Sequence, residues 1–152
     1  MRLMLVISIL CLVLGLHGCG GGKMEVVYDG SVECAHCKMN ILDNRFGAAL
    51  KTGKGRDYFF DGIECLVPFV HQSAEMKGQI AAHLFVTDFN KPGTLIEAPQ
   101  AYFMHSPALQ SPMAGNVAAF SSEEVMKTAQ SVYPQSSVWT WTQVQDSFKN
   151  LP

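Results

Sequence analysis

Charged residues are scarce in this sequence, and basic residues form no run. Only 16% of the 152 residues are Asp, Glu, Lys or Arg, and the formal net charge is −2. Because nucleic-acid-binding proteins concentrate Lys and Arg in patches or stripes, this composition argues against DNA or RNA as a partner. The chain also lacks a Ser/His/Asp set, a phosphate-binding glycine loop and a paired-carboxylate motif. We therefore expect neither an enzyme nor a protein that takes a small-molecule substrate.

Long hydrophobic runs are absent except at the N-terminus. Residues 3–16 are almost entirely apolar and follow the basic Arg2. This is the anatomy of a secretory signal core, and the run is too short to cross a bilayer comfortably. It ends at Leu16-His17-Gly18-Cys19. A small residue directly before Cys resembles the cleavage site of bacterial lipoproteins, in which the Cys thiol carries a diacylglycerol.

We expect a signal peptide at residues 1–18, a lipid on Cys19 and a flexible tether over residues 19–30, where three glycines follow the cysteine. Ordinary secretion with Cys19 as a free thiol and an uncleaved membrane span are the alternatives, and the short run and the glycines disfavour the span. Acylation of Cys19 would anchor the protein to the inner or outer membrane, facing the periplasm.

Cysteine is also sparse, with five residues in the chain. Cys11 lies in the expected signal peptide and Cys19 at its end, which leaves Cys34, Cys37 and Cys65 for the folded part. Three thiols cannot all pair internally, so at least one is free, in a mixed disulfide or bound to a metal. The chain has eight methionines, and thioethers, unlike thiols, form no disulfides in an oxidising compartment. This combination favours a soft-metal site.

The stretch Cys34-Ala35-His36-Cys37-Lys38-Met39 carries the densest set of soft donors. Two thiols separated by two residues can bind one ion, and Met39 adds a thioether from the same loop. Thiolate and thioether are polarisable ligands that prefer Cu(I) to hard cations, whereas a thioether is a poor ligand for Zn²⁺. Cys34, Cys37 and Met39 are therefore candidate ligands of Cu(I).

Two other interpretations of Cys34 and Cys37 stay open. They can form a disulfide or a redox pair of the thioredoxin type, although such pairs normally open a helix after a strand, and no strong strand precedes Cys34. Alternatively they belong to a structural zinc module, which would need a second ligand pair at similar spacing.

Further donors lie outside this loop. Met113 stands in turn-like sequence, where it is either a remote ligand or a residue that fills the core. Cys65 lies near the start of an expected helix, where it is either a stabilised thiolate or a small buried residue. Whether Cys65, His36, Met104 or His105, or a partner chain, completes the site is left open by the sequence.

Hydrophobic periodicity predicts an α+β fold in which the order strand, strand, helix, strand occurs twice. The expected elements are strands at 46–50, 57–60 and 82–89 with a helix at 63–76, then strands at 101–104, 116–120 and 138–142 with a helix that begins after Ser122. Each unit is too small to be very stable alone. We therefore expect two related ββαβ units, at about 31–92 and 93–152, packed into one body over residues 31–152.

In order and spacing these features resemble the NosL family. The resemblance rests on the lipoprotein signal, on the C-x-x-C-x-M loop and on short phrases further along: Tyr58-Phe59-Phe60-Asp61-Gly62-Ile63-Glu64-Cys65-Leu66, Val86-Thr87-Asp88-Phe89, and Pro112-Met113-Ala114-Gly115 before Ala118-Ala119-Phe120. It extends from Cys19 to about Phe148, nearly the whole chain after the expected signal peptide.

The resemblance implies a lipid-anchored Cu(I) chaperone. Such a protein works with an ABC-type membrane complex and delivers copper for the copper centres of nitrous oxide reductase. The family's Cys/Met loop carries over to Cys34, Cys37 and Met39, and its Pro-Met-Gly phrase carries over to Met113, with Ala114 inserted before the glycine. The resemblance also implies two small ββαβ units, in agreement with the periodicity. NosL-like proteins occur without the reductase as well, so the client is less firmly implied than the metal.

Overall fold

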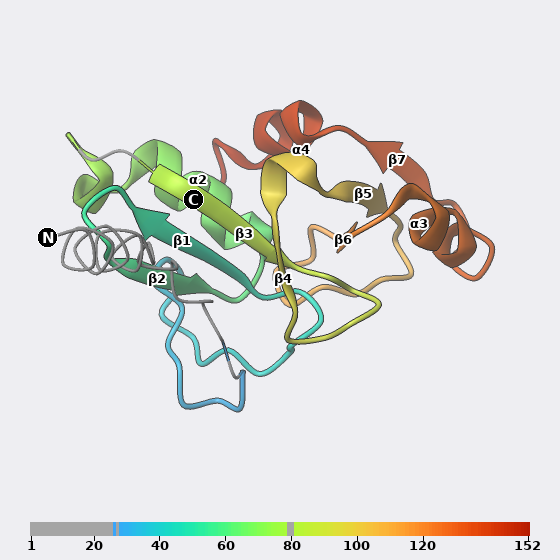
Figure 1. Ribbon diagram of the computed structural model, residues 1–152, viewed down its shortest axis with the longest axis horizontal. Helices are drawn as coiled ribbons and strands as arrows, with labels where there is room; N and C mark the ends of the chain where they lie inside the picture. Colours follow the sequence, from blue (N-terminus) through green and yellow to red (C-terminus); the bar gives the residue numbers. More distant parts are fainter. Residues whose placement is uncertain (1–25, 27, 79–80) are drawn as a thin grey trace, which may run out of the picture.

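The computed structural model describes residue 26, residues 28–78 and residues 81–152, without the side chains of residues 81 and 82. In this part of the chain two antiparallel sheets lie side by side along the long axis of the molecule (Figure 1). None of the described helices is long and apolar enough to cross a membrane. The expected signal peptide at 1–18, Cys19 and most of the tether over 19–30 lie outside the described residues.

The first sheet is built mainly from residues before Thr87. It contains β1 (Ala48–Thr52), β2 (Asp57–Phe60), β3 (Ala81–Thr87) and β4 (Leu95–Glu97), in the spatial order β2-β1-β3-β4 with every pair antiparallel. Helix α2 (Ile63–Gln72) and the short 3-10 helix η1 (Ala74–Met76) connect β2 to β3. The helix packs against β1 and β2, so its first turns lie in the core.

Pro68 lies inside α2, where we expected a late start or a bend in a helix over residues 63–76. The helix begins at Ile63, so Pro68 removes only the N–H that would bond to the carbonyl of Glu64. The helix ends earlier than expected because the backbone of Ser73 is extended, with its N–H bonded to the carbonyl of Phe69 at 3.1 Å. The expected helix is therefore split between α2 and η1.

The second sheet has three strands. β5 (Tyr102–His105) follows the 3-10 helix η2 (Ala98–Gln100), and β6 (Val117–Phe120) and β7 (Ser137–Trp139) flank β5 in the antiparallel order β6-β5-β7. Helix α3 (Glu123–Gln130) joins β6 to β7 and packs against β5 and β6. Its start is capped by Ser122, whose hydroxyl accepts a hydrogen bond from the Val125 N–H at 3.3 Å, as the sequence predicts.

The two sheets share one topology, which confirms the predicted α+β fold of two ββαβ units. In each unit the first strand is central, the second flanks it, and the third returns after a helix to pair on the other side. The first sheet extends further than expected, because β4 pairs with β3 although its residues fall in the range 93–152. The last strand is shorter than the expected 138–142, because Thr140 and Gln143 form a capping box that starts α4 (Trp141–Phe148).

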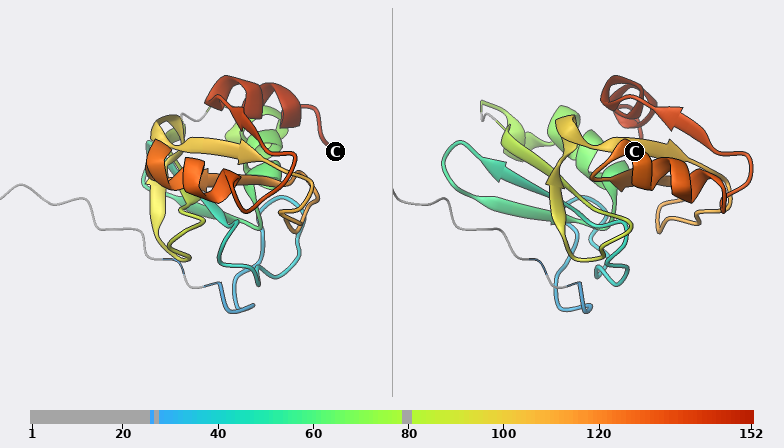
Figure 2. Two further views of the ribbon diagram at one scale, coloured as in Figure 1. Left: turned by 90° about the vertical axis from the view of Figure 1, so that its right-hand side faces the viewer. Right: turned by 45° about the vertical axis from the view of Figure 1, so that its right-hand side comes forward.

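The units are joined in one core. The Phe89 N–H donates to the Ala119 carbonyl at 2.8 Å, beside an isolated parallel bridge between Asp88 and Ala119. Helix α4 packs beside α2 (Figure 2), and Gln72 donates to the Lys149 carbonyl at 2.5 Å. The largest buried cluster contains side chains of both units, among them Phe60, Leu66, Phe103, Val144 and Phe148.

Candidate metal centre

The loop that carries Cys34 and Cys37 is a tight turn held by its own backbone. An antiparallel bridge pairs Glu33 with Asn40, and inside it the Cys34 N–H donates to the Met39 carbonyl at 2.8 Å. Lys38, at φ 64°, donates its N–H back to the Cys34 carbonyl at 3.1 Å. These bonds close the turn between the two cysteines, so both thiols lie on the same side of the turn.

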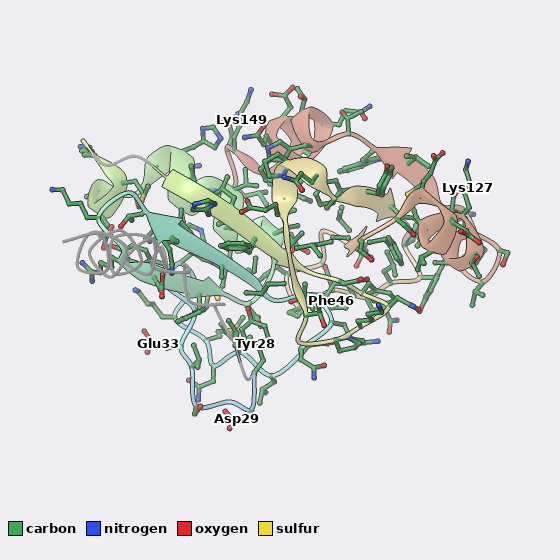
Figure 3. All side chains as sticks on the ribbon, viewed as in Figure 1. Tyr28, Asp29, Glu33, Phe46, Lys127 and Lys149 are labelled. Atoms are coloured by element: carbon green, nitrogen blue, oxygen red, sulfur yellow. The ribbon has the colours of Figure 1, made fainter. Side chains whose placement is uncertain are left out.

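This loop is fixed to the outer edge of the first sheet. β2 is an edge strand, and its Phe59 carbonyl accepts a hydrogen bond from the Ala35 N–H at 2.8 Å. The bond satisfies an edge carbonyl that would otherwise be free to pair with another chain. Glu33, directly before Cys34, lies on this loop beneath the sheet, whereas Lys127 lies on α3 at the opposite end of the molecule (Figure 3).

Cys65 reaches the loop from the first turn of α2. β2 leads through Asp61 and Gly62 straight into this helix, and the Cys65 N–H donates to the Gly62 carbonyl at 3.1 Å. The fully buried Leu66 fixes the rotation of the helix in the core. Because the Cys34 loop is attached to β2 and α2 follows β2 directly, Cys34 and Cys65 meet despite their distance in sequence.

The sulfur atoms of Cys34, Cys37 and Cys65 all lie within 4.8 Å of one another. All three thiols are free. For a metal–sulfur bond of about 2.3 Å, a planar site with three sulfurs separates them by about 4 Å. The three sulfur atoms therefore lie almost as close together as the binding of one ion requires. Among the described residues no other group of three His, Cys, Asp or Glu side chains meets this criterion.

The thiols differ in their tendency to ionise. A hydrogen bond from Cys65 lowers the pKa of Cys34 to about 5, with further help from the backbone N–H groups of Asp61, Cys37 and His36, and burial opposes the shift. Donation to Cys34 is the main reason why the pKa of Cys65 is raised, and burial is the main reason for the raised pKa of Cys37. The metal-free cluster therefore holds one thiolate and two protonated thiols at neutral pH.

Two buried carboxylates lie beside the cluster. Burial and the negative charge of Cys34 raise the pKa of Asp61 to about 6. Burial also raises the pKa of Glu64, against hydrogen bonds from Ser111 and Gly115. Burial therefore disfavours the charged form of both carboxyl groups.

The structure places the other predicted donors at different depths. Met39 and Met113 are on the surface, with relative exposures of 48% and 36%, and their role as ligands stays a prediction. Met104 is fully buried in the second core cluster, among Phe46, Phe120 and other apolar side chains. A methionine in that position serves packing.

The two candidate histidines make other contacts. His105 stacks on Trp139 with ring centroids 4.8 Å apart. His36 contacts the backbone oxygen of Pro152 through Nε2 at 3.2 Å.

Cys65 is the site residue that sequence reasoning left undecided. The available signal was its position three residues after Gly62, near the start of a helix that follows a strand. That signal predicts a perturbed thiol, but not that the C-x-x-C loop would be attached to the same strand. The pairing of Ala35 with Phe59 supplies the missing information.

The fold and the thiol cluster define a metal-binding type of α+β protein built from two related units. The model of the NosL family matches residues 25–148, and the chain belongs to this family. The crystal structure of the copper chaperone NosL from Shewanella denitrificans has the same fold, with a TM-score of 0.66 at 20% sequence identity. The match covers 83% of this chain and 98% of that one. No curated protein matches the sequence.

Proposed function

We propose that this protein is a Cu(I) carrier that works outside the cytoplasm. The observation that supports the proposal is the convergence of the sulfur atoms of Cys34, Cys37 and Cys65 within 4.8 Å. Soft thiolates select Cu(I), Zn²⁺ and related ions over hard cations. Among these ions, membership of the NosL family and the fold of a copper chaperone favour copper.

The number and type of donors favour Cu(I) over structural zinc. Structural zinc sites use four Cys or His ligands, whereas the described cluster contains three. Thioethers suit Cu(I), and the exposed Met39 follows Cys37 by two residues. We propose Met39 and Met113 as additional ligands, which complete or vary the coordination during transfer.

The depth of the thiols suggests how the ion is exchanged. Cys34 and Cys65 have no exposed surface, whereas Cys37 is partly exposed. Of the three thiols, Cys37 is therefore the one that a donor or acceptor protein can reach in the described part of the chain. In the proposed exchange an incoming sulfur replaces Cys37 first, while the two buried thiolates keep the ion until the partner has bound.

The proposed client and location rest on the family resemblance alone. We propose that residues 1–18 are removed, that lipidated Cys19 anchors the chain on the periplasmic side, and that nitrous oxide reductase and its ABC-type maturation complex receive the copper. In a host that makes the reductase, deletion of this gene should lower the copper content of the reductase. Restoration by the native chain but not by Cys65→Ala would support the client, and an unchanged copper content would contradict it.

Competition for Cu(I) tests the binding itself. The reduced chain is titrated anaerobically against a colorimetric Cu(I) chelator, and Cys34→Ser, Cys37→Ser and Cys65→Ser are compared with the native chain. We expect one Cu(I) per native chain and a loss of affinity of at least 100-fold for Cys34→Ser and Cys65→Ser. Native affinity in both variants would contradict the site.

Thiol–disulfide exchange by Cys34 and Cys37 is a second candidate, because the low pKa of Cys34 suits a nucleophilic thiolate. The loop does not open a helix, unlike redox pairs of the thioredoxin type. Catalysed insulin reduction that does not need Met39 would favour this function. Zinc in chain purified without added metal would favour a zinc module.

A further inference from the structure

We propose that Glu64 is a positioning residue that holds the Met113 loop, residues 111–116, against the thiol cluster. The proposal rests on the proposed function, in which Met113 is a ligand of Cu(I). It assigns a role to a buried carboxylate that is not a metal ligand. Through this residue the second unit contributes to a site built almost entirely on the first.

The contacts of Glu64 link the two units. Glu64 lies in the first turn of α2, next to Cys65, and only 2% of it is exposed. Its Oε1 accepts hydrogen bonds from the Ser111 hydroxyl and from the Gly115 N–H, the latter at 3.1 Å. Both donors come from the connection between β5 and β6. Because Glu64 is next to Cys65, these two hydrogen bonds tie the loop to the helical turn that carries Cys65.

The Met113 loop is a closed unit that Glu64 can hold as a whole. The Ser111 N–H donates to the Asn116 side-chain oxygen at 3.0 Å, and the Asn116 N–H donates to the Ser111 hydroxyl at 2.8 Å. Inside this ring the Ala114 N–H donates to the Ser111 carbonyl at 3.0 Å. Met113 stands at the turn, between residues that are bonded to Glu64 on either side. Fixing Ser111 and Gly115 therefore fixes the backbone that carries Met113.

Gly115 shows how closely the loop approaches. A Cβ at this position would collide with the Cγ and the carboxyl group of Glu64. A glycine allows the backbone to lie directly on the glutamate side chain.

Burial of Glu64 is costly for folding, because the carboxyl group loses its contact with water. A buried carboxylate without a cation is unfavourable, and no salt bridge to Glu64 occurs among the described residues. Its Oε2 atom has no hydrogen-bond partner among the residues that the structure describes. The second unit offers a comparison, because Glu124 holds the equivalent place in α3 and is exposed. Burial of the glutamate is thus a property of the unit that carries the thiols.

A double-mutant cycle between Glu64 and Met113 tests the proposal. Cu(I) affinity is measured by anaerobic chelator competition for Glu64→Ala, Met113→Leu and the double variant, with Glu124→Ala as the matched control. We expect Glu64→Ala to weaken binding about 10-fold, as loss of a supporting residue typically does, and Met113→Leu to weaken it at least as much. The double variant should be no weaker than Met113→Leu alone. Glu64→Gln retains an acceptor oxygen and should restore most of the affinity, and Glu124→Ala should bind as the native chain does.

Additive losses in the double variant would overturn the proposal, because Glu64 would then act independently of Met113. An unchanged affinity in Met113→Leu would overturn it as well. If Glu64→Ala does not fold, Ser111→Ala replaces it in the cycle, with the same expected and contrary results. Failure of the proposed function is recognised separately, since the native chain would then bind no Cu(I) at all.

Discussion

The sulfur atoms of Cys65 and Cys34 lie within 4.8 Å of each other across the junction between α2 and the C-x-x-C loop. Interaction with the Cys65 thiol is the main reason for the low pKa of Cys34. It joins a helix N-terminus to a loop held on the edge of β2, and it leaves the metal-free site with one thiolate. Binding of a metal to all three sulfurs must therefore displace the two remaining thiol protons.

Replacement of Cys65 should change the ionisation of Cys34 in a way that depends on the new side chain. In Cys65→Ala the donor is lost, so the pKa of Cys34 should rise from about 5 toward the ordinary thiol range. In Cys65→Ser a hydroxyl can still donate, so the pKa should stay low. The pKa of Cys34 in each variant is measured from the thiolate absorbance of the reduced, metal-free protein as a function of pH. An Ala variant that still titrates near pH 5 would show that Cys65 does not cause the shift.

Methionine substitutions should separate ligands from core residues. Leu removes the sulfur but keeps an apolar side chain of similar volume. Met113→Leu should lower Cu(I) affinity about 10-fold or more, and Met39→Leu should lower it severalfold, both with little effect on thermal stability. Met104→Leu should leave Cu(I) affinity unchanged, because Met104 is buried in the second core cluster. Loss of copper binding in Met104→Leu alone would reverse this assignment.

Asp61 should make the metal-free protein less stable at neutral pH than at low pH. Its pKa is raised from 3.8 to about 6 in the folded state, so the folded state binds the proton more tightly than the unfolded state does. The stabilisation that protonation provides is present below pH 4 and is lost as the pH rises through 6. Asp61→Asn should therefore raise the free energy of unfolding by about 1–3 kcal/mol at pH 7.5.

Denaturant unfolding of reduced protein at pH 7.5 and at pH 3.5 measures this difference. At pH 3.5 Asp61→Asn and the native chain should have nearly equal stability. The exposed Asp57 supplies the control, because Asp57→Asn removes only a surface ion pair with Lys51 and should change stability by less than about 1 kcal/mol. An equal gain from Asp61→Asn at both pH values would show that ionisation is not its cause.

The fold was predictable where local signals agree with the final packing. The strand at Asp57–Phe60 and the serine cap before α3 are found as the sequence indicates. The repeated order of strands and helices was predicted from stretches of strand-type and helix-type apolar periodicity. The errors lie at boundaries, where the extended Ser73 ends α2 early and the Thr140 capping box ends the last strand early. Both boundaries depend on how the end of a helix is capped, which apolar periodicity does not show.

The candidate site was predictable only in part. Cys34 and Cys37 could be found because their spacing alone allows a turn to bring the thiols together. Cys65 joins them through the register of the C-x-x-C loop on β2, a tertiary pairing that no local pattern encodes. The shape of the Met113 loop could not be predicted from the sequence either. Its Ala114 adopts a φ of 59°, and its position depends on contacts with a glutamate in the other unit.

X-ray absorption at the copper edge of the reduced, Cu(I)-loaded chain tests the three-thiol site most directly. The account predicts one copper per chain with at least three sulfur neighbours and no nitrogen or oxygen neighbour. It also predicts that Cys65→Ala removes one sulfur neighbour from that shell. A shell of two sulfurs in the native protein, or a native shell that Cys65→Ala leaves unchanged, would contradict it.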